Sequence, residues 1–387
     1  MKILQIHNEY LFKGGEDTIL NSEKKVLENN KNIVRQIIRK NSLEIRSLKD
    51  KMTVFKNLNY SIKSKDILNR TIASFKPDLA HIHNSFPLWS SSIIELLNDF
   101  NIPIVMTVNN FRFMCLNGQL YRNNKVCTKC LDGNIFNGVK YKCYQNSYLK
   151  SYAVYSYLKY IKNNKILNKI DRFIVNTSFT KNLFSKIINK KKIIIKPNFV
   201  FDHKIKKKDI KKDKYFLFIG RLSDEKGLDI ILNNIDNFQL KIKIVGDGPM
   251  FNELKNLNHP KLIVLGKKNK NQILKLMSEA TCLLFPSKWY EGMPLVLLEA
   301  LSVGLPIVAS NIGNMKFIIK NNYNGLLFNI NDTGKLSKYA NNIFNNKKLR
   351  LKLETNAKKI YHQRYTDKLN YIKMIKIYKD VIDSKKL

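Results

Sequence analysis

Acidic residues are scarce in this sequence of 387 residues: 30 Asp and Glu stand against 69 Lys and Arg, which gives a formal net charge of +39. Such a charge attracts acidic partners, for example anionic lipid head groups, nucleotides or nucleic acid. Lys occurs in every segment rather than in one cluster, and this distribution favours a compositional bias of the whole chain. Under either explanation, a surface this basic is drawn to anionic membranes at low salt.

Long apolar runs are also absent. No stretch of 18 apolar residues occurs, which argues against a membrane-spanning helix. The first residues, Met1 to His7, lack the apolar core and the cleavage site of a secretory signal peptide. We therefore expect a cytoplasmic protein, with peripheral binding at the inner face of the plasma membrane as the alternative that its charge allows.

Two nucleotide-binding signatures are missing. No full Gly-x-Gly-x-x-Gly follows the first predicted strand, which argues against a dinucleotide-dependent oxidoreductase. No Asp-x-Asp pair ends a predicted strand, so we do not expect a diphosphate that is held through a metal ion. The clustered aromatic residues of a nucleic-acid-binding module are absent as well, and no nucleic-acid partner is expected.

What the sequence does contain is an alternation of short β-branched runs with longer amphipathic stretches. This pattern is typical of parallel sheets with crossover helices, so we predict an α/β protein with two doubly wound domains. The strands predicted for the first domain are Lys2–Ile6, Ile33–Ile38, Leu79–His83, Ile104–Val108, Phe173–Asn176 and Ile193–Lys196. Those predicted for the second domain are Phe216–Ile219, Ile242–Val245, Leu262–Leu265, Cys282–Phe285, Ile307–Ala309 and Leu326–Phe328.

The boundary between the domains is predicted near residue 200. Pro197 and the following residues lead into Lys204–Lys214, which holds seven Lys and two Asp and is typical of a linker. We expect one domain over residues 1–200, a second over 201–365 and a last helix over 366–387. That helix could stay with the second domain or cross back to the first.

The segment from Glu291 to Glu299, Glu-Gly-Met-Pro-Leu-Val-Leu-Leu-Glu, carries the clearest functional pattern. Gly292 and Pro294 predict a tight turn, and the apolar run after them predicts the start of a helix. Backbone amides and the helix dipole at this point favour a diphosphate, and a carboxylate can accept hydrogen bonds from a sugar or ribose diol. The simpler alternative is a solvated glutamate beside a helix end.

Glycines end the predicted strands of the second domain. Gly220 follows the first of them, at the carboxyl edge where open α/β sheets bind ligands. Arg221 can form paired hydrogen bonds with phosphate oxygens, and Lys226 supplies a mobile charge at the next helix. A turn with surface charges is the simpler explanation. The next two strands end at Gly246, with Asp247 as an expected helix cap, and at Gly266, with Lys267 after it.

In the first domain, Gly14 and Gly15 precede a helical pattern after the first strand, and they allow backbone amides to approach a ligand. His81 and His83 end the third strand. His81 is expected to be a structural histidine at the edge of the sheet, whereas His83 lies nearer to the ligand-binding edge.

Together these motifs resemble the family 4, or group 1, glycosyltransferases of the GT-B fold. The resemblance covers nearly the whole chain, and it is closer still for bacterial cell-surface polysaccharide enzymes. It includes Gly-Gly-Glu-Asp-Thr at residues 14–18, His-Asn-Ser-Phe-Pro-Leu at 83–88 and a Cys-rich insert at 115–143. It implies two Rossmann-like domains that face a central cleft, with the nucleotide-sugar donor bound by the second and the acceptor by the first.

The activity that the resemblance implies is retaining transfer of a sugar from a nucleotide-diphosphate sugar to a glycan acceptor. No metal ion or other cofactor is required at the reaction centre. Arg221, Lys226 and Glu291 would be the catalytic residues, and Glu299 would bind the ribose. The other implied donor contacts are Gly14, Gly15, Asn109, Gly220, Gly246, Gly266, Lys267, Gly292, Met293, Pro294 and Leu295. Glu16 and His83 would lie on the acceptor side.

Asn109 is the one departure from the family pattern. The family usually places a histidine that touches the donor sugar at this position, after the strand Ile104–Val108. Asn can donate and accept hydrogen bonds but does not titrate near neutral pH. A non-catalytic or impaired homologue therefore stays an alternative, as does a basic protein that binds nucleic acid or anionic lipid.

Four of the five cysteines, Cys115, Cys127, Cys130 and Cys143, fall within thirty residues, and Cys127-x2-Cys130 is in the middle. This spacing suits a closed tetrahedral zinc site, and free buried thiols are the alternative. A cytoplasmic setting disfavours disulfides.

The segment from Tyr148 to Lys165 interleaves five Tyr with four Lys. Such a helix suits a membrane interface, in which case the acceptor would be a polyprenyl-diphosphate-linked glycan. A packed helix with a solvated Lys face fits the pattern equally well.

Overall fold

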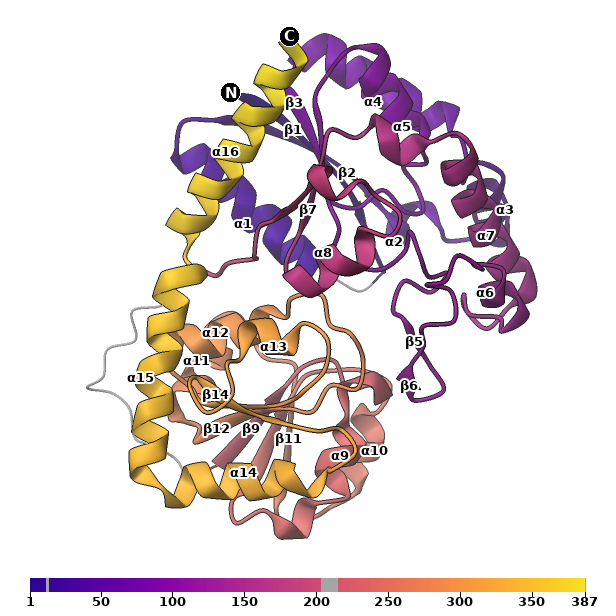
Figure 1. Cartoon of the computed structure of the whole chain (residues 1–387). Helices are drawn as coiled ribbons and strands as arrows, with labels where there is room; N and C mark the ends of the chain where they lie inside the picture. The colour runs from indigo at the N-terminus through magenta and orange to yellow at the C-terminus, as the bar shows by residue number, and fades with distance from the viewer. Residues whose placement is uncertain (12–13, 203–214, 387) are drawn as a thin grey trace. The chain divides into compact units, whose positions relative to one another are not determined.

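The computed structural model describes residues 1–11, 14–202 and 215–386 (Figure 1). The chain forms two compact units. Unit 1 consists of Met1–Leu120, Cys127–Asn198 and Lys368–Leu387, and unit 2 consists of Tyr121–Val126 and Phe199–Asp367. The Lys204–Lys214 run, for which the sequence predicts a linker, lies outside the described residues.

Unit 1 is built on a parallel six-stranded sheet in the order β2-β1-β3-β4-β7-β8. Its strands are β1 (Lys2–Glu9), β2 (Ile33–Lys40), β3 (Leu79–Ile82), β4 (Ile104–Thr107), β7 (Arg172–Val175) and β8 (Ile193–Ile195). The six strands predicted for this part of the chain are confirmed. The interior strands β1, β3, β4 and β7 are almost wholly buried, because helices cover both faces of a parallel sheet.

The helices of unit 1 include the last helix of the chain. They are α1 (Gly15–Asn29), α2 (Asn41–Glu44), α3 (Leu48–Lys56), α4 (Ile62–Phe75), α5 (Ser92–Asp99), α6 (Asn137–Lys140), α7 (Tyr148–Asn163), α8 (Ser178–Phe184) and α16 (Asp367–Lys386). Met374, Ile377, Tyr378 and Val381 follow the i, i+3, i+4, i+7 spacing of one helix face. These four side chains are buried against Ile3 and other strand residues, so α16 completes the core of unit 1.

Unit 2 has the same kind of sheet, in the order β11-β10-β9-β12-β13-β14. Its strands are β9 (Tyr215–Ile219), β10 (Lys241–Val245), β11 (Leu262–Gly266), β12 (Cys282–Phe285), β13 (Ile307–Ser310) and β14 (Gly325–Phe328), and all six were predicted from the sequence. Alternate residues of β9 point to opposite faces of the sheet. Phe216 and Phe218 lie in one hydrophobic core, and Leu217 lies in the other.

The helices of unit 2 cover these two cores. They are α9 (Leu228–Leu232), α10 (Phe251–Asn256), α11 (Lys270–Glu279), α12 (Leu295–Val303), α13 (Met315–Ile318), α14 (Gly334–Asn345) and α15 (Lys347–Arg364). Helix α12 is apolar on nearly all sides, as expected for a helix that is buried between neighbours. Helix α15 packs on it through Ala357 and Tyr361.

The sequence did not predict the two-stranded hairpin of β5 (Tyr121–Arg122) and β6 (Lys125–Val126), whose strands have only two residues each.

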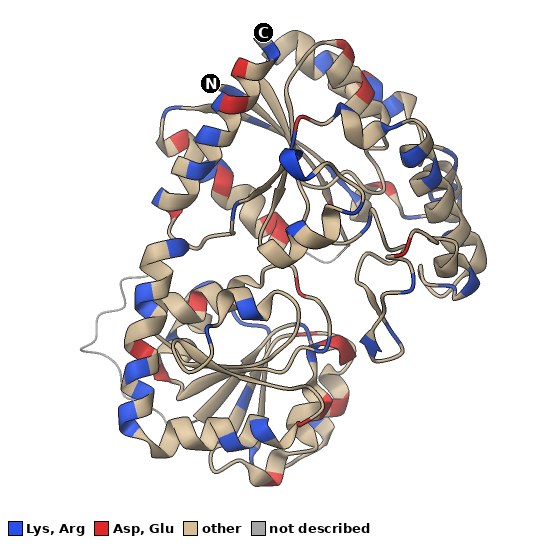
Figure 2. Ribbon diagram, in the orientation of Figure 1, with Lys and Arg blue, Asp and Glu red and all other residues tan. Residues whose placement is uncertain are grey.

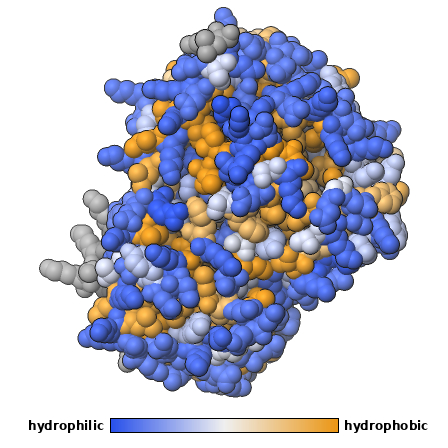
Figure 3. Space-filling model, viewed as in Figure 1, coloured by the Kyte–Doolittle hydropathy of each residue, from blue (hydrophilic) through white to orange (hydrophobic). Residues whose placement is uncertain are grey.

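Lys and Arg are spread over the helices and loops of both units rather than gathered in one place (Figure 2). Hydrophilic residues dominate the face drawn in Figure 3, where hydrophobic residues show through in patches. None of the helices in the described ranges has the length and apolar character needed to cross a membrane.

Candidate functional site

Several of the site residues predicted in unit 2 lie where the strand order of its sheet reverses. Strands β9 and β12 are adjacent in the sheet although two other strands separate them in the sequence. Ligands of open α/β sheets bind outside the carboxyl ends of the strands at such a switch point. The segment Gly220–Lys226 leaves the carboxyl end of β9, and the segment that contains Glu291 leaves that of β12.

Lys226 and Glu291 bind each other at this edge. The Lys226 Nζ atom donates to Glu291 Oε1 over 2.7 Å, and Ser287 Oγ donates to the same oxygen over 2.8 Å. Glu291 is 5% exposed, so its carboxylate is largely removed from water. The ammonium group also lies 5.1 Å from the centre of the Trp289 ring. A buried carboxylate and a lysine are therefore held together beside the helix start that the sequence predicts.

Polar side chains of the neighbouring strand-end loop hold the Glu291 loop in place. Asn314 Nδ2 donates to the backbone oxygens of Glu291 and Gly292, at 2.5 and 2.6 Å. Ser310 Oγ donates to the backbone oxygen of Ser287 at 2.5 Å. Asn314 and Ser310 were not predicted, and Ser287 was given no role, because nothing in the local sequence indicates which acceptor oxygen each side chain reaches.

Helix α12 begins at Leu295, as predicted, with Pro294 in the N-cap position. No side chain in the described part of the chain caps this end, so the first turn presents backbone donors and the positive end of the helix dipole. Glu299 lies in the second turn, with its side chain 12% exposed, and its carboxylate accepts a hydrogen bond from Lys270 of α11. Met293 is buried in the core, so any donor contact that it makes must come from its backbone.

Two glycines let the loops come close together. Gly246 has a φ of +149°, and a Cβ atom there would lie 1.8 Å from the backbone oxygen of Gly220. Gly227 has a φ of +73°, and a Cβ atom there would lie 2.0 Å from the backbone oxygen of Pro286. Both contacts are too short for any side chain. These two positions therefore bring the ends of β9, β10 and β12 into contact.

The other predicted site residues of unit 2 also follow the carboxyl ends of strands. Arg221 is exposed. Gly266 ends β11, the outermost strand on that side, and the exposed Lys267 follows it.

Asp247 does not cap a helix, because α10 starts only at Phe251 with Met250 as its N-cap. Asp247 Oδ1 instead accepts from the amide of Gly248, so that prediction was wrong.

In unit 1, Gly14 and Gly15 lie at the start of α1, the helix that follows β1. The strand order of this sheet reverses between β1 and β3, so this helix start lies at the switch point. The Gly14 amide donates to Asp17 Oδ2 over 2.7 Å, and Asp17 Oδ1 lies 2.9 Å from His7 Nε2. Burial would raise the pKa of Asp17, but the hydrogen bonds from His7 and Gly14 outweigh it and hold the pKa below its usual value. Neither His7 nor Asp17 was predicted to have a role at this helix start.

Glu16 is the next residue of this helix, and its carboxyl group is less well paired. Burial raises its pKa above the usual value, although the charge of His7, a hydrogen bond from Asn110 and the charge of Arg112 oppose the shift. One carboxylate oxygen, Oε2, is buried without a hydrogen-bond partner among the described residues. A hydroxyl group of a ligand could satisfy it.

His83 and Asn109 line one small cavity of about 30 Å³, together with Arg112 and Tyr157. Both ring nitrogens of His83 and the amide nitrogen of Asn109 are buried and lack a hydrogen-bond partner within the described ranges. Burial lowers the pKa of His83 to about 4, although the charge of Glu23 opposes the shift, so the ring is neutral at pH 7. Buried polar atoms without partners are rare in proteins. This cavity is therefore suited to a group that both donates and accepts hydrogen bonds, such as a sugar hydroxyl.

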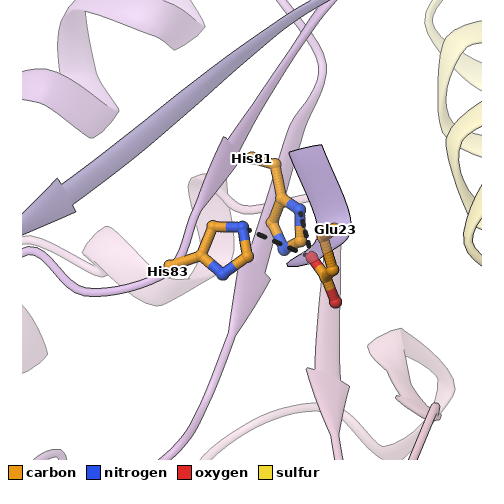
Figure 4. A group of neighbouring side chains, drawn as sticks. All are labelled: Glu23, His81 and His83. Carbon is orange, nitrogen blue, oxygen red and sulfur yellow. Dashed lines mark ion pairs between the residues drawn. The ribbon is translucent and has the colours of Figure 1, made fainter. Parts of the chain in front are cut away.

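His83 also belongs to a buried cluster with Glu23 and His81 (Figure 4). Their ligand atoms lie close enough to hold a metal ion, with Glu23 Oε2 3.5 Å from His83 Nε2 and 3.9 Å from His81 Nδ1. However, Lys196 Nζ already lies 2.6 Å from Glu23 Oε1, and both side chains are at most 2% exposed. A buried ammonium group in contact with the carboxylate disfavours a second cation there. We interpret the cluster as a buried ion pair with two neutral histidines.

His81 connects this cluster to the last helix, α16, through a hydrogen bond. Its Nδ1 atom lies 2.7 Å from the Tyr378 hydroxyl of α16, and its Nε2 atom lies 2.7 Å from Thr107 Oγ1. His81 has no exposed surface and lies on β3, in the interior of the sheet. His81 is therefore a structural histidine, as expected, but the expectation that it lies at the edge of the sheet was wrong.

The sequence matches two protein families over adjoining stretches. Residues 40–202 match Glycosyltransferase Family 4, and residues 200–360 match Glycosyl transferases group 1. An uncharacterized glycosyltransferase of Methanocaldococcus jannaschii is 24% identical over 333 residues, which are 85% of this chain and 83% of that protein.

Two further comparisons involve proteins of stated ligand or activity. The UDP-Gal:alpha-D-GlcNAc-diphosphoundecaprenol alpha-1,3-galactosyltransferase of Escherichia coli is 37% identical over 131 residues, which are 30% of this chain and 33% of that enzyme. The crystal structure of Anabaena HepE in complex with UDP aligns with a TM-score of 0.68 at 15% identity, over 98% of this chain and 100% of that one. At that identity the likeness concerns the fold.

Proposed function

Since the chain belongs to the family 4, or group 1, glycosyltransferases of the GT-B fold, we propose that unit 2 binds a nucleotide-diphosphate sugar and that the sugar is transferred with retention of its anomeric configuration. The observation that carries this proposal is the group of Lys226, Glu291 and Ser287 at the switch point of the sheet, beside the uncapped start of α12. It combines a cation for a diphosphate with a carboxylate for sugar hydroxyls.

In the proposed reaction, the bond between the anomeric carbon and the diphosphate breaks and the diphosphate leaves with the electron pair. A hydroxyl oxygen of the acceptor forms the new bond to that carbon, and the hydroxyl proton passes to the leaving diphosphate. Lys226 and Arg221 would offset the negative charge that develops on the leaving diphosphate, which is the kind of stabilisation that accelerates such a step most. No metal ion is assigned to the reaction centre.

Glu299 is proposed to accept hydrogen bonds from the two ribose hydroxyls. We expect Glu299→Ala to raise the Kd for the free nucleoside diphosphate about 10–100-fold, because charge-assisted hydrogen bonds contribute about 1.5–3 kcal/mol each and about 1.4 kcal/mol corresponds to tenfold. Isothermal titration calorimetry with UDP and GDP measures this change.

Glu279→Ala is the matched control. Glu279 ends α11, immediately before β12, and so lies at the opposite edge of the sheet from Glu299. Its removal should leave the nucleotide affinity unchanged within error. Equal affinities of the Glu299→Ala and wild-type proteins would refute the proposal that Glu299 binds the ribose. The roles proposed for Lys226 and Glu291 do not depend on this result.

We further propose that the acceptor is a lipid-linked glycan of surface-polysaccharide synthesis, with its glycan end near Glu16 and His83. A groove of about 290 Å³ on unit 1 supports a lipid partner. Its walls are mainly apolar and carry two cations, Lys51 and Lys150, and none of the residues that line it within the described ranges is acidic. An apolar chain with a diphosphate group matches this combination.

Exposed apolar side chains adjoin the groove on two of the helices that line it. Leu48 and Met52 of α3 are 78% and 62% exposed, and Leu149 and Tyr152 of α7 are 83% and 57% exposed. The buried face of α7 includes Tyr157 and Ile161, so the C-terminal part of this helix is packed, as one of the two alternatives predicted. Its first turn has the composition of a membrane-interface segment, which is the other alternative.

The double variant Met52→Ser/Leu149→Ser is expected to bind anionic vesicles at least about tenfold more weakly than the wild type, since each buried apolar side chain contributes about 1.5–3 kcal/mol. Co-sedimentation with phosphatidylglycerol vesicles gives the affinity. Leu351→Ser removes an exposed leucine from α15 of unit 2 and serves as the control. Identical binding of the double variant and the wild type would contradict this use of the groove.

A further inference from the structure

The Cys-rich insert has little regular structure of its own. Between Cys115 and Cys143 the structure contains only the β5–β6 hairpin and the single turn of α6. Four non-glycine residues of this stretch adopt positive φ angles, namely Leu120, Asn123, Asn124 and Lys142. Such backbone conformations are costly and persist only where the surroundings fix them. The few hydrogen bonds between two-residue strands are too weak to fix these backbone conformations by themselves.

Two of the cysteines begin closely similar turns. Cys115-Leu-Asn-Gly118 and Cys130-Leu-Asp-Gly133 share the pattern Cys-Leu-Asx-Gly. In each, the glycine amide donates to the cysteine carbonyl oxygen, over 2.9 Å for Gly118 and 3.3 Å for Gly133, and both glycines have positive φ. Cys115 and Cys130 are 7% and 9% exposed. The insert therefore places two buried thiols on matching turns.

The other two cysteines lie at the base of the hairpin and shortly after α6. The Cys127 amide donates to the Leu120 oxygen over 2.8 Å, next to the hairpin strands, and the Cys143 amide donates to the Gly138 oxygen over 2.9 Å. Gly138 packs against Leu116, the residue after Cys115, so closely that a Cβ atom at Gly138 would lie 2.4 Å from Leu116 Cδ1. Asn137 Nδ2 donates to the backbone oxygen of Lys129, the residue before Cys130, over 2.7 Å. The segments that carry the four cysteines are therefore neighbours in the fold.

The chemistry around these thiols favours a soft divalent cation. The insert contains no histidine or glutamate and one aspartate, Asp132, so sulfur is its dominant ligand type. It also carries Arg122, Lys125, Lys129, Lys140 and Lys142. Zinc with four thiolates has a net charge of about −2, and these basic side chains would offset that charge.

We propose that Cys115, Cys127, Cys130 and Cys143 bind one zinc ion that fixes the conformation of the insert. Binding replaces the proton of each thiol, so one proton leaves for each cysteine that becomes a ligand. No three of these sulfur atoms lie within 4.8 Å of one another in the described residues, so the ion must draw them together. Rotation about the Cα–Cβ bond moves each sulfur atom without displacing the backbone. The site is independent of the sugar-transfer reaction.

The test is the metal content of the purified full-length protein after dialysis, measured by inductively coupled plasma mass spectrometry. We expect about one equivalent of zinc in the wild type and less than about a tenth of an equivalent in Cys127→Ser/Cys130→Ser. Cys282→Ala is the matched control, because Cys282 is a fully buried thiol on β12 of unit 2, and this variant should keep its zinc. Absence of zinc from the wild type, or retention of zinc by the double variant, would overturn the proposal.

A measurement on the wild type alone covers the case in which the double variant does not fold. Cobalt(II) exchanged into the protein should give the intense ligand-field and thiolate charge-transfer bands of a tetrahedral sulfur site. A mass lower by two hydrogens for each cysteine pair would show disulfides instead. Visible absorption of the protein as purified would show an iron–sulfur cluster. Either of these last two results contradicts a zinc site.

Discussion

Replacement of Lys226 with alanine is expected to lower kcat for sugar transfer about 10²–10³-fold, the usual effect of removing one group that stabilises charge in the transition state. Lys226 lies 2.7 Å from Glu291, and its side chain is 17% exposed. Its ammonium group is therefore fixed before the donor binds, and little reorganisation is needed at the reaction. The Kd of the free nucleoside diphosphate should change much less than kcat, because the charge on the leaving group develops mainly in the transition state.

Lys288→Ala provides the matched control for this prediction. Lys288 lies in the same loop as Glu291 but forms an ion pair with Asp229 of α9, at 3.0 Å, and the Asp229 side chain is 48% exposed. A pair this accessible contributes at most about 1 kcal/mol. The control should therefore change turnover less than about fivefold. If the two variants lose activity equally, Lys226 has no special role in catalysis.

The second large effect is expected on stability, at the buried pair of Lys196 and Glu23. Lys196→Ala should destabilise unit 1 by about 3–5 kcal/mol, because it leaves a carboxylate of 1% exposure without its counter-ion. Lys196 Nζ also lies 3.3 Å from Asn370 Oδ1, so the variant loosens the contact with α16 as well. Differential scanning calorimetry should show the transition of unit 1 at a lower temperature.

Two further variants distinguish a buried charge from a general loss of packing. Lys335→Ala removes one partner of an exposed pair, Lys335 with Asp332 at 2.7 Å, and should cost less than about 1 kcal/mol. Glu23→Gln/Lys196→Met removes both charges and should recover much of the stability that Lys196→Ala loses. A double variant that is no more stable than Lys196→Ala would argue against the charge explanation.

The sequence predicts the twelve main strands of this protein because most of them are buried on both faces and form short, nearly continuous apolar runs. The start of α12 is equally well predicted, since Gly292 and Pro294 interrupt the chain just before it. The hairpin around Asn123 escapes prediction for the opposite reason. Its strands have two residues each and no periodicity that a pattern could detect.

The contacts that build the candidate site could not be read from the sequence. Lys226 and Glu291 are far apart in the chain, and only the parallel pairing of β9 with β12 brings their loops together. Asn314 and Ser310 act on the Glu291 loop through hydrogen bonds to its backbone, which no motif records. In the same way, His81 is covered by α16, whose Tyr378 is 297 residues away in the sequence.

Retaining sugar transfer from a nucleotide-diphosphate donor can be observed directly by proton NMR of the reaction. The protein is incubated with α-linked UDP- and GDP-sugars and with lipid-linked acceptors, and the anomeric signals are followed. We expect one donor signal to disappear and an α-anomeric product signal to replace it. A β-anomeric product, or no consumption of any donor by a protein that binds its nucleotide, would contradict retaining transfer.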